Sequence, residues 1–151
     1  RIVTLVVSII MFAFSTRLWA GFNPDLPGFQ FVDHFTWIPQ FGISYHVGVD
    51  GVSLLLVLLT TLLLPVVVLA AWSLNIEHIK SLHISFLLLT TGMIGTFVSL
   101  DLFLFYIFWE ITLIPMYFII GVWGGPRRIY AAVKFFLFTM VGSVLMLVAI
   151  L

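Results

Sequence analysis

The 151-residue chain contains no cysteine and little charge. Without cysteine it can form no disulfide, perform no thiol chemistry and hold no iron–sulfur cluster through thiolates. Charged residues make up 8% of the chain, against roughly a quarter in a soluble globular domain, whereas hydrophobic residues make up 63%. The six basic and six acidic residues balance, so no basic surface for nucleic acid is expected. This composition excludes a soluble globular domain and indicates a multi-pass membrane protein.

Five long apolar runs account for this composition, and nine of the twelve charged residues lie outside them. Each run is long enough to cross a hydrocarbon core of about 30 Å as a helix, and none shows the alternation of a barrel strand. We therefore predict an all-α polytopic membrane protein that forms a single transmembrane domain over residues 1–151. Because no polar loop follows the last run, we expect the chain to be a fragment. The predicted helices are 2–19, 52–72, 82–100, 102–121 and 130–151.

The loop between the first two runs, residues 20–51, is predicted to contain a β-hairpin outside the membrane. Apolar and polar residues alternate over 41–49, and the large aromatic residues over 29–37 all fall at odd-numbered positions, as on one face of a strand. Residues 38–40 would form the turn. Asp50 follows the hairpin and is placed to cap the next helix by accepting a bond from a free backbone N–H.

The basic residues indicate which helix ends face the cytoplasm. Four of the six fall on one side of the membrane when the helices alternate in direction: Arg1, Lys80, Arg127 and Arg128. Only Arg17 lies at the opposite ends, and Lys134 lies just inside the membrane on the basic side. We therefore expect the loops 73–81 and 122–129 in the cytoplasm and the loop 20–51 outside.

Glu110 is the most informative residue because it lies about nine residues from the outer end of its run, near the middle of the membrane. An ionised carboxylate there costs about 3 kcal/mol on insertion scales, and such groups face a bundle interior or a water cavity. The structural alternative is a protonated Glu that only bonds a neighbouring carbonyl. A Gln would serve that purpose without an ionisable group, which favours a functional role.

The residues around Glu110 favour a proton relay. Tyr106 lies one turn before it and Tyr117 two turns after it, so both hydroxyls are predicted on its side of the helix. Pro115 cannot bond the carbonyl of Ile111, and this freed group could hold water. A cation that approached and withdrew would favour release and uptake of the Glu110 proton in turn.

Lys134 is the only basic residue well inside a run, and it is a weaker candidate for the relay. Counted from the loops, it differs from Glu110 by roughly 10 Å in depth, which argues against a direct pair. It either extends its ammonium group to the cytoplasmic surface or provides a water-linked entry point for protons. Asp101 is expected to cap its helix. His78 and His83 lie five residues apart, which is not a spacing for metal ligands on one helix face, so no metal site is predicted.

The run Trp-Glu-Ile-Thr-Leu-Ile-Pro-Met-Tyr at 109–117 resembles the antiporter-like membrane subunits of respiratory complex I, and most closely the subunit M (chain 4) family of NADH-quinone oxidoreductase. Segments 37–54 and 128–136 agree with this family. The proline at position 115 favours subunit M over its subunit L relative. In the family, the Glu that matches Glu110 works with a Lys on the next helix but one. That Lys would lie beyond Leu151, so Lys134 does not correspond to it.

The resemblance implies a proton-translocating subunit that couples quinone reduction to proton pumping through the buried Glu. It implies no redox site and no cofactor in this chain. NADH, FMN, iron–sulfur clusters and quinone would be bound by other complex I subunits, so an enzyme label belongs to the complex. The expected location is the bilayer of the bacterial inner membrane.

Three other functions remain open. The chain could belong to a multisubunit Na⁺/H⁺ antiporter, or it could be a non-conducting membrane assembly subunit. It could also be a membrane-embedded enzyme that uses Glu110 as an acid and base. An enzyme would need a second catalytic group at the depth of Glu110, and the sequence offers none.

Overall fold

The computed structural model describes residues 1–150, which form five α-helices and one antiparallel β-hairpin. The predicted fold class is therefore confirmed. The helices are α1 (Ile2–Gly21), α2 (Gly51–Ala70), α3 (Ile79–Val98), α4 (Leu102–Trp123) and α5 (Arg128–Ile150). The hairpin consists of β1 (Gln30–Ile38), a 3-10 turn (Pro39–Phe41) and β2 (Ile43–Val49). Leu151, which ends the last apolar run, lies outside the described residues.

All five helices are long and apolar enough to span a membrane. Their ends differ from the ends of the apolar runs by up to three residues. The largest difference is at α3, which begins at Ile79 instead of residue 82. Hydropathy marks the residues that lipid can cover, whereas a helix begins where backbone hydrogen bonding begins, and that can happen in the polar loop.

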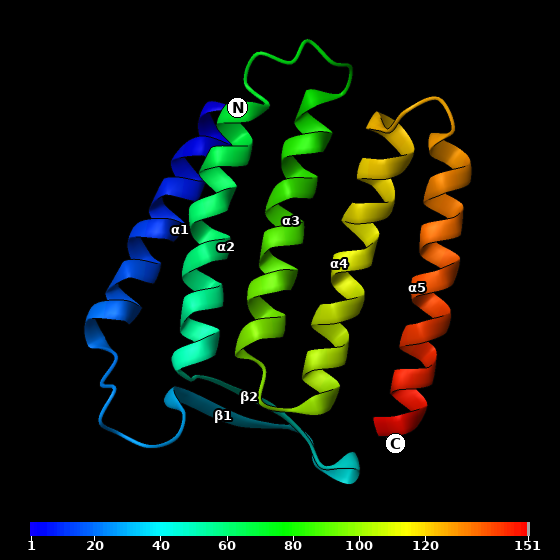
Figure 1. Ribbon diagram of the computed structural model, residues 1–151. Coiled ribbons are helices and arrows are strands. Elements are labelled where there is room, and N and C mark those ends of the chain that lie inside the picture. Colours follow the sequence, from blue (N-terminus) through cyan, green and yellow to red (C-terminus); the bar gives the residue numbers. More distant parts are fainter. Residues whose placement is uncertain (151) are drawn as a thin grey trace.

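The helices stand side by side in chain order, each in contact with the next (Figure 1). The N terminus, the α2–α3 loop and the α4–α5 loop lie at one end of this row, and the hairpin and the α3–α4 turn lie at the other (Figure 1). A helix in such a row buries only the sides that face its neighbours. In α5, at the end of the row, the buried residues are Ala132 and Ser143.

The hairpin forms as predicted, one residue later than expected at its turn. His34 lies opposite His46, and their rings make an edge contact with centroids 4.9 Å apart. The register shifts between Gln30 and Asp33, where Phe31 has a φ of 52°. A left-handed residue breaks the alternation at the start of β1, which the sequence pattern could not indicate.

Asp101 caps α4 as predicted and also holds the hairpin against the helices. Its Oδ1 accepts bonds from the N–H groups of Phe103 (2.9 Å) and Leu104 (3.0 Å). Its Oδ2 accepts bonds from the backbone N–H (3.0 Å) and the hydroxyl (3.2 Å) of Ser44 in β2. Partial burial raises the pKa of Asp101, but the bonds from Leu104, Ser44 and Phe103 lower it more, so this pKa lies below its usual 3.8. The predicted cap at Asp50 is also confirmed, as a capping box with Ser53.

We expect Asp101→Asn to loosen β2 while α4 stays capped. The amide keeps one acceptor oxygen for the cap, but its NH₂ group cannot accept the two bonds from Ser44. Hydrogen exchange at the β2 amides should become roughly tenfold faster, the equivalent of losing about one hydrogen bond. Exchange at the Phe103 and Leu104 amides should not change.

The pH dependence of amide exchange in the unmodified protein provides a control for this variant. A carboxylate with a lowered pKa in the folded state contributes stability above its unfolded pKa and loses it as pH falls through the folded value. The β2 amides should therefore exchange faster only below about pH 3.8. Unchanged exchange in Asp101→Asn would instead mean that the backbone bond from Leu100 to His46 suffices to hold the hairpin.

Candidate functional site

One side of α4 packs tightly against α3. A Cβ atom added to Gly92 would lie 2.7 Å from Cγ2 of Thr112, and one added to Gly95 would overlap the Phe108 ring. The two glycines therefore allow close approach of the helices, as small residues do in membrane proteins. Phe108 and Thr112 mark the side of α4 that faces α3.

The opposite side of α4 faces α5 and carries Glu110. The ring of Tyr117 contacts the ring of Phe136, with centroids 5.6 Å apart. A Cβ added to Gly121 would lie 3.5 Å from the Cβ of Ala132. Glu110 lies seven residues before Tyr117, which is two helical turns, so it shares this side.

Glu110 is the ninth residue of the 22-residue α4, roughly 12 Å along the helix axis from its first residue. Its Oε1 atom is buried and has no hydrogen-bond partner among residues 1–150. A buried polar atom without a partner costs about 1–3 kcal/mol, so such atoms are rare in structural positions. An acceptor left open in this way is suited to a mobile proton or to a water molecule.

The predicted relay residues do not all share the side of Glu110. Tyr106 is one turn from Glu110 on the α5 side, and Tyr117 is two turns away, but neither hydroxyl bonds Oε1 of Glu110. Pro115 is fully buried and lines a cavity between α3 and α4 together with Ser85. The helix continues through Pro115, whose ring packs toward α3.

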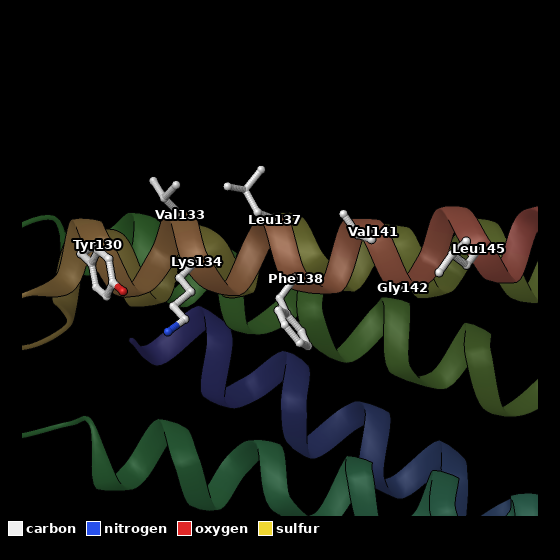
Figure 2. A pocket seen from close by; sticks show the side chains of 8 residues that line it. All are labelled: Tyr130, Val133, Lys134, Leu137, Phe138, Val141, Gly142 and Leu145. Atoms are coloured by element: carbon white, nitrogen blue, oxygen red, sulfur yellow. The ribbon is translucent and has the colours of Figure 1, made fainter.

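Lys134 is exposed and does not face α4. Its Nζ lies 5.7 Å from the centre of the Tyr130 ring. Figure 2 shows Lys134 beside Tyr130 and Phe138 along an apolar groove of α5. Two residues of α5 that contact α4, Ala132 and Phe136, lie on the other side of the helix. Lys134 and Glu110 are therefore not brought together.

His83 is a polar residue whose burial the sequence did not reveal. It is 3% exposed, and neither ring nitrogen has a hydrogen-bond partner among the described residues. Its ring meets Phe86 edge-on at 6.0 Å. The sequence signal for this burial is the place of His83 inside the apolar run 82–100. Within residues 1–150 no group of three or more potential metal ligands occurs.

Comparisons with known proteins place these features in a family. Residues 99–151, which include Glu110, match the family model described as NADH:quinone oxidoreductase/Mrp antiporter, TM. Over 147 residues the chain is 53% identical to NADH-quinone oxidoreductase subunit M of Rhodobacter capsulatus, covering 97% of this chain and 28% of the relative. It is 46% identical over 152 residues to NADH-ubiquinone oxidoreductase chain 4 of Arabidopsis thaliana, covering 100% of this chain and 31% of the relative.

The fold matches a solved structure as well. A chain of respiratory complex I from Thermus thermophilus with bound NADH superposes with a TM-score of 0.82 at 29% sequence identity. The match covers 96% of this chain and 29% of that one. The chain thus spans roughly 30% of the length of its relatives. Through nearly all of its length it is similar to these proteins, and it belongs to the family of antiporter-like membrane subunits of respiratory complex I, with subunit M and chain 4 as its relatives.

Proposed function

We propose that the protein translocates protons as a membrane subunit of NADH-quinone oxidoreductase, with Glu110 as a reversible proton carrier. The observation that carries this proposal is the buried, unpartnered Oε1 of Glu110 in the middle of a membrane-spanning helix. Family membership supports the same function, because the relatives are subunits of this oxidoreductase.

The carrier role follows from the energetics of a carboxyl group in lipid. An ionised carboxylate at mid-membrane costs about 3 kcal/mol, and a positive charge that comes close offsets this cost. Arrival of a cation stabilises the ionised form and releases the proton, and departure of the cation favours uptake of another. Among residues 1–150 the one basic side chain well inside an apolar run is Lys134, which faces away from α4, so the cation comes from a partner outside these residues.

The same proposal assigns the redox chemistry to other complex I subunits. These would bind NADH, FMN, iron–sulfur clusters and quinone, and this chain would respond to quinone reduction through contacts within the lipid bilayer. The chain has no cysteine to hold a cluster. We place the five helices in a single transmembrane domain in a bacterial inner membrane, in keeping with the Rhodobacter relative.

A subunit of a multisubunit Na⁺/H⁺ antiporter is the second candidate, because the matching family model includes the Mrp antiporters. Proton pumping by reconstituted vesicles containing Glu110→Gln tests the carrier role. Dependence of that pumping on NADH and quinone separates the two candidates, since an Na⁺/H⁺ antiporter exchanges ions without electron transfer.

Lys134→Ala should reduce proton pumping by less than about threefold, a change of under 1 kcal/mol. The Lys134 ammonium lies beside Tyr130 on the side of α5 away from Glu110, and an exposed cation–π contact is worth about 0.5–1 kcal/mol. The initial pumping rate, normalised to assembled complex, measures the effect. Lys134→Arg, which keeps the charge, is the matched control. A loss as large as that of Glu110→Gln would place Lys134 on the proton path.

A further inference from the structure

A cavity of about 420 Å³ lies between α3 and α4, at the end of the row that carries the α2–α3 and α4–α5 loops (Figure 1). Its apolar walls include Ile84 and Leu88 of α3 and Ile114 and Phe118 of α4. Beyond Leu88 the glycines of α3 bring the two helices into close contact, so the cavity ends there. It is therefore a groove that opens at the loop end and closes toward the middle of the membrane.

The groove is about as deep as one leaflet of a bilayer. Leu88 lies nine residues beyond Ile79, where α3 begins, and Ile114 lies nine residues before Trp123, where α4 ends. Nine residues span roughly 14 Å of helix. Half of a hydrocarbon core measures about 15 Å, whereas a membrane-spanning helix would need a surface roughly twice as long. The depth of the groove therefore fits an acyl chain better than another helix.

A polar cavity of about 500 Å³ continues from the mouth of the groove, because His78, Val122 and Trp123 line both cavities. Its lining also includes one acidic and one basic residue, Glu77 and Arg128. Nε1 of Trp123 donates to the backbone carbonyl of Glu77 at 2.9 Å, and the Arg128 guanidinium donates to the carbonyl of Val122 at 2.6 Å. Both acceptors belong to the backbone, and a guanidinium has five N–H donors, so Arg128 keeps donors for a ligand.

We propose that the two cavities form one binding site for a phospholipid with an ethanolamine head group. One acyl chain lies in the groove, the phosphate bonds the Arg128 guanidinium, and the ammonium group bonds the Glu77 carboxylate. The two opposite charges of the polar cavity match the two charges of this head group. Phosphatidylglycerol fits less well, because its anionic head group offers no positive charge to Glu77.

The bound acyl chain packs against α4 where the backbone of that helix is weakest. Pro115 lines the groove and cannot donate a hydrogen bond to the carbonyl of Ile111. A lipid chain at this level fills the space that the two helices leave open and supports the half of α4 nearer the loops. This role requires no ionisation of Glu110, so the inference stands apart from the proposed proton-carrier function.

Photoreactive phospholipids test the site in the assembled complex, reconstituted into bilayers. Phosphatidylethanolamine and phosphatidylglycerol, each with a photoreactive group at the end of one acyl chain, are compared at equal concentration, and labelled peptides are identified by mass spectrometry. The ethanolamine lipid should label peptides containing Leu88 or Ile114 about threefold to fivefold more, the upper range for an exposed ion pair. Glu77→Gln should remove this preference. Arg128→Gln should lower labelling by both lipids.

Leu88→Trp tests the place of the acyl chain. The larger side chain fills the inner end of the groove, so labelling of the peptide that contains Ile114 should be lost. Leu63→Trp is the matched control, because Leu63 of α2 does not line the groove and is 48% exposed, close to the 41% of Leu88. It should leave labelling unchanged.

Equal labelling of the groove by the two lipids in the unmodified complex would overturn the inference, since the head group would then not be selected. Absence of labelling would also overturn it and would mean that a protein segment covers the groove. Unchanged labelling in Leu88→Trp would place the acyl chain elsewhere, with the same consequence. If Leu88→Trp does not assemble, the variants of Glu77 and Arg128, whose side chains are exposed, still decide the question.

Discussion

Vesicles containing the complex with Glu110→Gln should pump protons at least about a hundredfold more slowly than the unmodified complex, because a positioned proton-transfer group contributes about 10²–10⁴-fold. Gln has nearly the same shape as Glu and can form hydrogen bonds, but it cannot ionise. The complex should therefore assemble normally while pumping and the coupled quinone reduction are suppressed. The measurement is the initial rate of vesicle acidification by purified complex, normalised to the amount of assembled complex.

Glu110→Asp provides the graded control. It keeps the ionisable group but shortens the side chain by one methylene, so it should retain partial pumping, and more if water bridges the gap. Normal pumping by Glu110→Gln would show that Glu110 is a buried structural group. Loss of assembly in Glu110→Gln but not in Glu110→Asp would likewise assign the residue to folding, since the carrier role requires an assembled, inactive complex.

Gly95→Ala should destabilise the packing of α3 on α4 by about 1–3 kcal/mol, the usual cost of overpacking. Ala is favoured over Gly within a helix by about 1 kcal/mol, but the added Cβ would overlap the Phe108 ring. Phe108 lies on the side of α4 that packs against α3. One helix must move away from the other, so the α5 side of α4, with Glu110, shifts as well. The yield of assembled complex and the temperature at which it loses quinone reductase activity measure the effect.

Gly121→Ala is the matched control, because its added Cβ would make ordinary contact with Ala132 at 3.5 Å. It should be neutral or stabilising. Combining Gly95→Ala with Phe108→Ala should cost less than the two changes made separately, because the smaller side chain removes the overlap. Equal stability of Gly95→Ala and Gly121→Ala would mean that α3 and α4 do not approach at Gly95 in the assembled complex.

The sequence by itself determined the features that depend on residues close together in the chain. Long apolar runs indicate membrane-spanning helices because lipid offers no partner for backbone groups. The alternation over 41–49 predicted a strand, and Asp50 and Asp101 were recognised as caps because a cap bonds residues only two or three positions away. Glu110 stood out because a charged residue within an apolar run is costly wherever the helix packs.

Only the tertiary structure decided which side chains meet across helices. Pro115 is close to Glu110 in sequence, yet it faces α3, and Lys134 faces away from α4 although its place inside an apolar run made it a candidate for the relay. Where α5 rests along α4 depends on contacts between residues far apart in the chain, such as Gly121 with Ala132. A local pattern specifies which residues share a helix face, whereas the fit of two surfaces specifies what that face meets.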